Sequence, residues 1–363
     1  MSVFPLDLDQ AAQHLMQDYP PAHELHLQFE SWKVRLKTNS KELVDDLADY
    51  YGPFVAQAQE SHVTVHAFET EPLNLDWDWT RKTPDPGKTK IKEAWVNLKG
   101  GRAVRKLITG MTFLFGGDYH LAVGPCVKNS NQIINFINNR HIQWHLEKGC
   151  LLGHAAGVSF EDKGLALAGF SGAGKSTLAL HIMSLGAHFV SNDRLMVENK
   201  ADETLMYGVA KLPRINPGTA LNNPDLASVM PAEDKERFSK LPTKELWDLE
   251  HKYDAHIDEC FGPGKFHLSA PMNGLFILHW THSGEPMEIR RVNPDERRDL
   301  LAAFMKTTGL FYLPPQGDEE KDPPAEVYVE GLKKVAVYEL FGGVDFAKAA
   351  ELGMRFLKTG DVK

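Results

Sequence analysis

Residues 164–193 read GLALAGFSGAGKSTLALHIMSLGAHFVSND, and this stretch decides the fold class of the chain. Residues 164–168 are a short apolar run typical of a buried strand, and residues 175–185 repeat apolar positions at helical spacing. Gly186 ends the predicted helix, and residues 187–191 supply a second strand. Strand, loop, helix and strand in this order are typical of a βαβ unit, so we predict an α/β protein with parallel strands.

The loop between the first strand and the helix fits the P-loop pattern, which is a glycine, four residues, then Gly-Lys-Ser. Its glycines let consecutive N–H groups point at phosphate oxygens, and the helix adds the positive end of its dipole. Lys175 is placed to reach the β- and γ-phosphates of a nucleotide, and the Ser176 hydroxyl to hold Mg²⁺. The predicted nucleotide-binding residues are Gly169, Phe170, Ser171, Gly172, Ala173, Gly174, Lys175, Ser176 and Thr177.

An acidic residue, Asp193, follows the second strand directly. Because parallel strands end at a common edge of the sheet, we expect Asp193 to lie close to the phosphate loop. A carboxylate there can accept a proton from an attacking hydroxyl or bind Mg²⁺ through water. The alternative is a solvated aspartate that only caps a turn.

Residues 1–140 read as a smaller α/β domain without a recognisable site. Residues 25–29 are strand-like, and Ser40 is placed to cap a helix over residues 41–51. Further along the chain, residues 274–280 read as a buried strand, and residues 294–306 and 344–357 as surface helices. We therefore predict two domains, residues 1–140 of unknown role and residues 141–363 with the P-loop.

A basic region interrupts the first domain of this acidic chain. It is either a solvated hairpin whose edges are protected by lysines or a docking surface for an acidic protein or an anionic substrate. Its members are Arg81, Lys82, Lys88, Lys90, Lys92, Lys99, Arg102, Arg105 and Lys106.

The composition excludes several classes of protein. The net charge of -9 and the pI near 6.0 argue against nucleic acid as the main partner. No apolar run reaches the roughly 18 residues that a membrane span needs, and the N-terminus MSVFPLDLDQ lacks the features of a secretory signal. The 3 cysteines are scattered, which favours reduced thiols. We therefore expect a cytoplasmic protein that binds neither nucleic acid nor membranes.

His154 precedes the loop glycine Gly169 by 15 residues, and Asp193 follows the loop serine Ser176 by 17. The spacing of these four residues resembles that of the HPr kinase/phosphorylase family, bacterial enzymes that phosphorylate a serine of the sugar-transport carrier HPr. In that family a histidine precedes the first loop glycine by 15 residues, as His154 precedes Gly169. The second of two paired aspartates follows the loop serine by 17 residues, as Asp193 follows Ser176. The resemblance implies a P-loop kinase domain of the HPr kinase type, with a mixed sheet and flanking helices.

Two further segments extend the resemblance to roughly residues 149–280. Leu246-Trp247-Asp248 and Tyr253-Asp254 resemble the family's Trp-Asp and Tyr-Asp-Arg segments. The group to which the chain is most similar is the HprK-related kinases, in particular kinase B, which are associated with ATP-grasp partners. The resemblance thus implies ATP and Mg²⁺ as cofactors, a partner protein of the same bacterial system, and a homo-oligomer, since HPr kinases form hexamers.

The departures from the family pattern concern its reverse reaction and its acceptor. The first aspartate of the pair is here Asn192, and the arginine tied to dephosphorylation is Ala255. Residues 269–274 read SAPMNG where the family has a basic segment. The family's acidic metal ligand is missing near Arg214, and Asn216 or an acid elsewhere is the candidate to replace it. We therefore expect no phosphorylase activity and an acceptor other than HPr.

The resemblance also implies a role for each matched residue. Asp193 is the base that takes the proton of the acceptor hydroxyl, His154 supports or orients it, and Lys175 stabilises the γ-phosphoryl group. Ser176 and Asp193 are the candidate magnesium ligands. The leading hypothesis is an ATP-dependent kinase acting on a protein serine or a small metabolite. The alternative, which Asn192 keeps open, is a nucleotide-binding switch or an ATPase that has lost transfer to an acceptor.

Overall fold

The computed structural model describes residues 5–84, 89–242, 245–246, 249, 251–314 and 322–363. The chain divides into two compact units, each described by itself below. Unit 1 comprises Met1–Glu147 and Thr308–Glu320, and unit 2 comprises Lys148–Thr307 and Lys321–Lys363. Both units combine helices with mixed sheets, which confirms the predicted α/β class. The predicted division after residue 140 falls within a helix, α3 (Ser130–Glu147).

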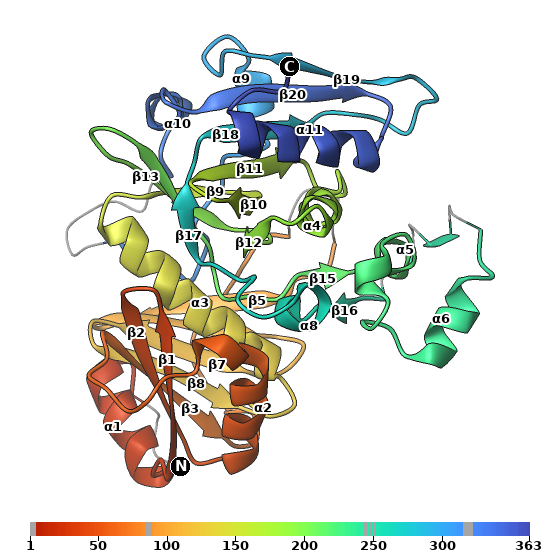
Figure 1. Ribbon diagram of the computed structural model, residues 1–363. Coiled ribbons are helices and arrows are strands. Elements are labelled where there is room, and N and C mark those ends of the chain that lie inside the picture. Colours follow the sequence, from red (N-terminus) through yellow and green to blue (C-terminus); the bar gives the residue numbers. More distant parts are fainter. Residues whose placement is uncertain (1–4, 85–88, 243–244, 247–248, 250, 315–321) are drawn as a thin grey trace. The chain divides into compact units, whose positions relative to one another are not determined.

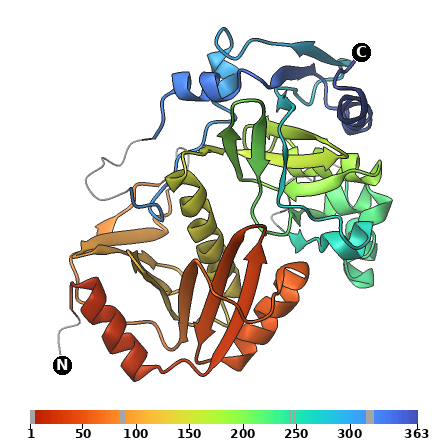
Figure 2. The same cartoon turned by 60° about the vertical axis from the view of Figure 1, so that its left-hand side comes forward.

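In its described residues, unit 1 is built on one sheet with the strand order β1-β2-β3-β8-β7-β6-β5-β4 (Figures 1 and 2). The pairs β2–β3 and β3–β8 are parallel, and the other neighbours are antiparallel. The strands are β1 (His23–Phe29), β2 (Trp32–Thr38), β3 (Val63–Glu69), β4 (Thr80–Arg81), β5 (Glu93–Leu98), β6 (Gly101–Lys106), β7 (Thr112–Gly116) and β8 (Tyr119–Gly124).

Helices cover both faces of this sheet because its strands alternate their apolar residues. Leu114 and Leu121 belong to a core cluster with Leu8 of α1 (Leu8–Asp18). Phe113, on the opposite face, packs on Phe136 of α3 with ring centroids 4.9 Å apart. The remaining helices of this unit are α2 (Lys41–Tyr51), whose first turn Ser40 caps as predicted, and the short 3-10 helix η1 (Gly52–Phe54).

Unit 2 is built on a six-stranded sheet with the order β12-β10-β11-β18-β20-β19. Strands β11, β18 and β20 are parallel, while β10 is antiparallel to both β11 and β12. The two strands of the predicted βαβ unit, β11 and β12, therefore point the same way, but β10 lies between them. The strands of this sheet are β10 (Ala155–Phe160), β11 (Lys163–Gly169), β12 (His188–Ser191), β18 (Gly274–Leu278), β19 (Met287–Arg291) and β20 (Ala336–Gly342).

Two smaller sheets complete the strands that the structure describes in unit 2. One has the order β17-β14-β13-β9, and the other pairs β15 with β16. Their members are β9 (Leu151–Gly153), β13 (Leu195–Asn199), β14 (Thr204–Tyr207), β15 (Arg214–Ile215), β16 (Tyr253–Asp254) and β17 (Ser269–Pro271). The helices are α4 (Lys175–Ser184), α5 (Pro217–Leu221), η2 (Pro224–Leu226), α6 (Ala232–Phe238), α8 (Ile257–Phe261), α9 (Arg298–Leu301), α10 (Ala325–Gly331) and α11 (Phe346–Thr359).

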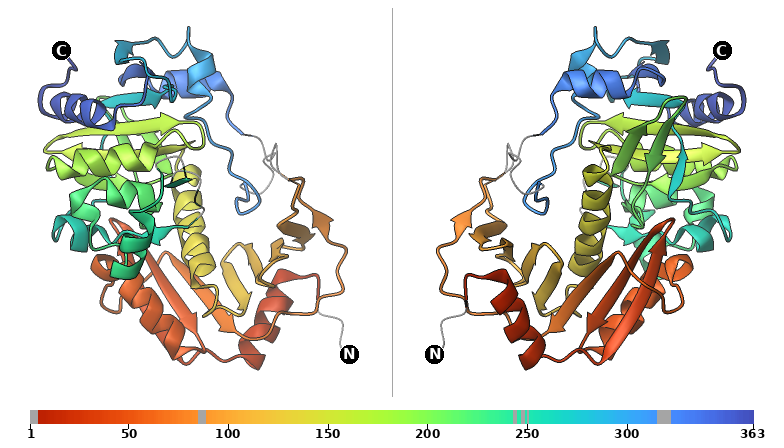
Figure 3. Two further views of the ribbon diagram at one scale, coloured as in Figure 1. Left: turned by 90° about the vertical axis from the view of Figure 1, so that its right-hand side faces the viewer. Right: turned by 90° about the vertical axis from the view of Figure 1, so that its left-hand side faces the viewer.

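The large sheet of unit 2 is buried on both faces, as its continuous apolar strands require. On one face Leu167 packs in a cluster with Ile182 of α4 and Phe356 of α11. On the other face Ala166 belongs to a cluster with the small sheet and with helices α9 and α10. Figure 3 shows these helices on opposite sides of the sheet. The site described below lies at the edge where β11 and β12 end.

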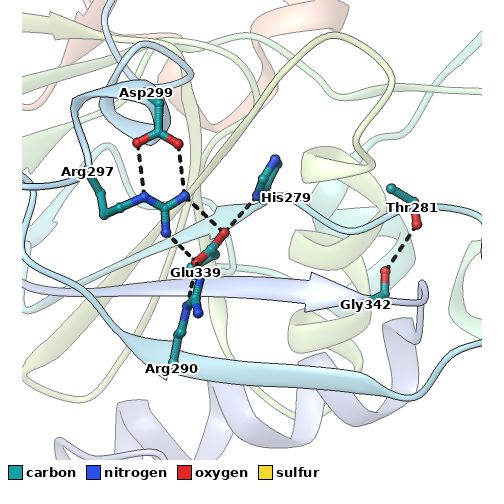
Figure 4. A network of polar contacts seen from close by, with 7 residues as sticks. All are labelled: His279, Thr281, Arg290, Arg297, Asp299, Glu339 and Gly342. Atoms are coloured by element: carbon teal, nitrogen blue, oxygen red, sulfur yellow. Dashed lines mark hydrogen bonds and ion pairs between the residues drawn. The ribbon is translucent and has the colours of Figure 1, made fainter.

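One charged side chain is buried in this sheet, the carboxylate of Glu339 on β20, which is 1% exposed. It accepts hydrogen bonds from Arg290 (2.7 Å) and Arg297 (2.9 Å) and lies 2.7 Å from Nδ1 of His279 (Figure 4). Desolvation opposes the charge of this carboxylate, but Arg297, His279 and Arg290 outweigh it and lower its pKa to about 2. The network ties β20 and β19 to the end of β18.

Candidate active site

The phosphate loop connects the end of β11 to the start of α4. Gly172 and Gly174 have φ angles of 84° and 88°, which only glycine adopts without strain. Gly174 is the N-cap residue of α4, and none of the described side chains caps that helix end. The N–H groups of the first turn are therefore left for a ligand, which is the arrangement that binds phosphate.

Lys175 lies inside this loop and is only 8% exposed. Its Nζ donates to the carbonyl oxygens of Gly169 (2.8 Å) and Phe170 (3.5 Å), so the loop carbonyls hold the ammonium where a phosphate would compete for it. Burial lowers the pKa of Lys175, and the nearby negative charge of Asp193 acts in the opposite direction. An ammonium held this way is available to an anionic ligand.

The two hydroxyl residues after the lysine have different surroundings. Ser176 is partly exposed in the first turn of α4, so its hydroxyl can serve a bound metal. Thr177 is buried, and its Oγ1 lies 3.0 Å from Oγ1 of Thr219. The Thr177 side chain therefore holds α5 against α4, and only its N–H group remains for the predicted contact with a nucleotide.

A second layer of residues fixes the shape of the loop. The indole Nε1 of Trp280, just after β18, donates to the carbonyl oxygen of Ala173 at 2.9 Å. The Phe346 ring packs so close to Gly174 that a Cβ there would lie 2.5 Å from Cζ of the ring. Phe170, by contrast, is 54% exposed at the tip of the loop. The loop is supported from below and open at its tip.

His154 and Asp193 meet at the same edge of the sheet as the loop. Strand β10 begins where β11 and β12 end, because it runs antiparallel to both. His154, the residue before β10, therefore lies between the two strand ends, and its Nε2 is 3.0 Å from Oδ1 of Asp193. The backbone N–H of His154 donates to the carbonyl oxygen of Phe304 at 2.6 Å, which fixes the histidine at this edge.

Both oxygens of the Asp193 carboxylate face cationic or donor groups. Oδ1 faces His154, and Oδ2 pairs with the Arg194 guanidinium. Desolvation of the carboxylate acts against its charge, but His154, Arg194 and Lys175 outweigh it and lower the pKa of Asp193 to about 2. Asp193 is therefore ionised throughout the physiological pH range.

Asn192 places an amide next to this carboxylate. Its Oδ1 is buried, and no hydrogen bond to it is found in the described part of the chain. Buried polar atoms are usually paired, so an oxygen in this state marks a place for a bound water or ligand. Asn192, Ser176 and Asp193 all offer oxygen atoms, the donors that Mg²⁺ prefers.

Several cations that the sequence analysis did not select surround the loop and Asp193. The positive charges of Arg194 and Lys306 lie near enough to Lys175 to disfavour its ammonium form. Around Lys211, the charge of Asp193 favours the ammonium form and that of Arg194 disfavours it. Arg194 had an available signal, because it follows Asp193 directly in the sequence. Lys211 and Lys306 reach the site from other loops, and no local pattern marks them. A cationic cluster within an acidic chain favours an anionic ligand.

The segments expected to supply further acids are also placed. Asn216 caps α5 through its Oδ1, which accepts from the Thr219 N–H at 2.9 Å, so that oxygen already has a structural task. Asp254 lies opposite Arg214 in the β15–β16 pair, with Oδ1 3.4 Å from its Nε. Ala255 is fully buried. Trp247 and Asp248, part of the family resemblance, lie outside the described residues.

The described residues contain neither a preformed metal cluster nor a membrane-spanning helix. Within these ranges, no three His, Cys, Asp or Glu side chains gather so as to hold a metal ion. A P-loop magnesium needs no such cluster, because phosphate and water supply most of its ligands. Among the same residues, no helix has both the length and the apolar character that crossing a membrane requires.

Comparison with known proteins adds little to this picture. No protein-family model and no curated protein matches the chain. Among solved structures, the chain is similar to the Hpr(Ser) kinase/phosphatase from Coxiella burnetii, with a TM-score of 0.31 and 10% sequence identity over 58% of this chain and 97% of that one. A likeness at this TM-score decides neither fold nor function, so the residues of the site must decide the function.

Proposed function

We propose that this chain is a Mg-ATP-dependent phosphotransferase that transfers the γ-phosphoryl group to a hydroxyl. The acceptor is a serine of a protein or a small metabolite. The observation that carries the proposal is the meeting of the P-loop lysine, Lys175, with the His154–Asp193 pair at one edge of the sheet. A P-loop alone binds nucleotide, whereas a carboxylate beside it can also receive an acceptor hydroxyl.

The loop and its cations would bind and polarise the triphosphate. Lys175 exchanges its bonds to the loop carbonyls for bonds to phosphate oxygens, and the open N–H groups at the start of α4 hold the neighbouring oxygens. Ser176, Asp193 and Asn192 are the residues that would hold Mg²⁺ and its waters, and the bound ion neutralises charge on the phosphates. These contacts supply positioning and charge stabilisation, which phosphoryl transfer chiefly requires.

Asp193 would receive the acceptor. The hydroxyl donates a hydrogen bond to the carboxylate, its oxygen forms the new bond to the γ-phosphorus, and the bond to the β-phosphate oxygen breaks. The proton passes to Asp193 late in the step. A carboxylate with a pKa of about 2 is a weak base, but a loose transition state asks for little deprotonation beforehand. His154 acts as a positioning residue that fixes the orientation of the carboxylate.

The finer features of this proposal rest on the resemblance in sequence spacing. They are a kinase domain of the HPr kinase type, ATP as the nucleotide, a partner protein of the same bacterial system and a homo-oligomer. The absence of phosphorylase activity rests on the departures from that family, among them Asn192 and Ala255, and the cytoplasmic location rests on the composition and the N-terminal sequence.

Calorimetric titration with Mg-ATP tests the proposal. The full chain should bind, Lys175→Ala should lose binding, and Asp193→Asn should keep it while losing transfer of label from ATP to an acceptor. Lys240→Ala is the matched control, because Lys240 lies outside the site, 70% exposed, and pairs with Glu236. Absence of Mg-ATP binding by the wild type would overturn the proposal, and so would equal losses in Lys175→Ala and Lys240→Ala.

A second function is favoured by one observation. Both carboxylate oxygens of Asp193 already face His154 and Arg194, which would suit a nucleotide-binding switch or an ATPase without an acceptor. Such a protein would release phosphate steadily from ATP, and labelled acceptor would not accumulate. Transfer of label to any hydroxyl compound, abolished in Asp193→Asn, decides for the kinase.

A further inference from the structure

Unit 1 contains a cavity of about 380 Å³ that the proposed kinase chemistry does not use. The described residues that line it all belong to unit 1. They come from the β5–β6 hairpin and its approach, from the turn into β7 and β7 itself, from α3 and from the segment after Thr307. Cavities of this size typically hold small organic molecules.

The wall formed by the segment after Thr307 is held by buried cations. Arg102, 5% exposed, donates to the carbonyl oxygens of Leu310 (3.2 Å) and Tyr312 (3.4 Å). Arg140, 3% exposed, donates to the carbonyl oxygen of Phe311. Two buried guanidinium groups therefore fix the backbone on either side of the Phe311 ring, which faces the cavity.

Three aromatic rings form an apolar floor. The centroid of Phe113 lies 4.9 Å from that of Phe136 and 5.4 Å from that of Phe311. The Phe311 ring also stacks on Phe115 at 5.6 Å. Rings arranged in this way favour the face or edge of another planar group.

One face of α3 lines the cavity with amides. Gln132, Asn135 and Asn139 line it together with Phe136, at the i, i+3, i+4 and i+7 positions of the helix. Thr109 is bonded to Gln132, whose Nε2 donates to its Oγ1 at 3.0 Å. Amide groups offer both donors and acceptors, so this side can orient a polar substituent.

Lysines make the opposite rim positive. Four lysines, Lys82, Lys90, Lys92 and Lys106, line the cavity, and among its described lining residues Glu93 is the single carboxylate. Lys106 and Lys82 pair with Glu93, the latter at 3.4 Å. Lys90 and Lys92 are exposed, and neither has an acidic partner in the described part of the chain. Two cations are thus left to face an anion. Lys88, also in the predicted basic region, lies outside the described residues.

We propose that this cavity binds a small organic anion, a carboxylate or phosphate group carried on an aromatic ring. The ring would pack against Phe311, which is partly exposed and which the buried Phe113 supports, and the anionic group would reach Lys90 and Lys92. Of the two interpretations of the basic region, this selects an anionic small molecule, because the apolar floor lies within a cavity too small for a protein surface. The site does not depend on phosphoryl transfer.

Saturation-transfer NMR and titration with phenyl phosphate and phenylacetate test the site on the full chain. The chain carries Lys175→Ala, so that the P-loop does not contribute to phosphate binding. Both anions should bind, and Lys90→Ala/Lys92→Ala should weaken them about tenfold, as expected for two exposed charge contacts. Phe311→Ala should weaken both while circular dichroism shows an intact fold.

Matched probes and variants keep the test decisive. Lys41→Ala/Lys128→Ala removes the same charge from exposed positions of unit 1 that do not line the cavity, and it should leave binding unchanged. Inorganic phosphate has the anionic group without the ring, and benzyl alcohol has the ring without the anionic group. Each should bind at least about tenfold more weakly than phenyl phosphate. No binding of either anion up to about 10 mM, equal losses in the two double variants, or equal binding of benzyl alcohol would overturn the proposal.

Discussion

Asp193 shows how one carboxylate is kept charged and oriented at the site. It is held between His154 and Arg194, with Lys175 acting at longer range. Burial alone would raise its pKa, so the low value near 2 reports the strength of its partners. A side chain fixed in this way is ready to orient a hydroxyl, and it loses little freedom when a substrate binds.

We predict that Asp193 stabilises the fold above about pH 4 and that this contribution fades toward pH 2. The unfolded chain takes up a proton near the ordinary pKa, about 3.9, whereas the folded carboxylate stays ionised down to about 2. The free energy of unfolding of the wild type should therefore exceed that of Asp193→Asn at about pH 6, and the difference should shrink between about pH 4 and pH 2. Urea unfolding at several pH values measures it.

A control for net charge is Asp202→Asn in the turn between β13 and β14, which removes one exposed carboxylate from the same unit. If that variant showed the same difference with the same pH dependence, the effect would belong to net charge, and the partners of Asp193 would not explain it.

The buried carboxylate of Glu339 gives a second prediction. Removing Arg297 leaves a carboxylate that is 1% exposed with one partner fewer, so Arg297→Met should lower the free energy of unfolding by about 1–3 kcal/mol. Arg291→Met, on the exposed side of β19, should change it by less than about 0.5 kcal/mol. Adding Glu339→Gln to Arg297→Met should recover part of the loss, and a double-mutant cycle by urea unfolding measures the coupling. Additive losses would contradict the network in Figure 4.

The residues of the site could be predicted from the sequence where they follow one another along the chain. The P-loop sequence led to Lys175 because neighbouring backbone groups and the following helix make the phosphate cradle locally. The contact between His154 and Asp193 depends on β10 entering the sheet between β11 and β12, which no local pattern reveals. Arg194 remained unnoticed beside Asp193, and Lys211 and Lys306 come from separate loops.

At the scale of elements, strong periodicity was a good guide. The helix predicted over residues 175–185 is α4, Lys175–Ser184, and the one predicted over residues 41–51 is α2. The long helix α3 was missed because it buries polar side chains, including Arg140 and His141, so its apolar stripe is interrupted.

The helix predicted over residues 294–306 was wrong. Only one turn, α9, is helical there, and at its end Leu300, Leu301, Ala303 and Phe304 are buried. The chain then extends so that the Phe304 carbonyl can accept from the His154 N–H, and Met305 forms a bridge with Gly153. Tertiary pairing with Gly153 and His154, where β9 gives way to β10, has overridden the helical pattern.

The turn from β11 into α4 gives a third prediction, because its two glycines with positive φ angles differ in their surroundings. A Cβ at Gly172 would meet no atom within 4 Å, whereas one at Gly174 would lie 2.5 Å from the Phe346 ring. Gly172→Ala should therefore cost about 1 kcal/mol of stability from backbone strain. Gly174→Ala should lower the free energy of unfolding by about 2–4 kcal/mol, because overpacking against Phe346 is added to the backbone strain. It should also weaken the binding of Mg-ATP.

Adding Phe346→Leu to Gly174→Ala separates the two causes, since a smaller side chain relieves the clash and leaves the strain. Urea unfolding and calorimetric titration with Mg-ATP measure both quantities. Equal costs for the two glycine variants would show that Phe346 does not constrain the loop.

At the scale of the whole molecule, the chain is organised as two units whose segments interleave in sequence. Thr308–Glu320 belongs to unit 1, although the residues before and after it belong to unit 2. Sequence patterns could not reveal that this segment goes back to unit 1. Arg102 and Arg140 hold it there by donating hydrogen bonds to its backbone carbonyl oxygens. Backbone acceptors are the same in every residue type and leave no mark in the sequence.

We predict that the two units unfold in separate transitions, because each has its own core. If Mg-ATP binds as proposed, it binds only the folded P-loop in unit 2, so at about 100 times its dissociation constant it should raise the free energy of unfolding of that unit by about 2.7 kcal/mol. Phe136→Ala should lower the free energy of unfolding of unit 1 by about 3–5 kcal/mol, because Phe136 is fully buried in that unit. Differential scanning calorimetry with and without Mg-ATP separates the two effects, and Leu178→Ala in α4 is the matched core variant of unit 2. A single transition that moves as a whole with the nucleotide and with either variant would contradict the prediction, because it would mean that neither core is stable without the other.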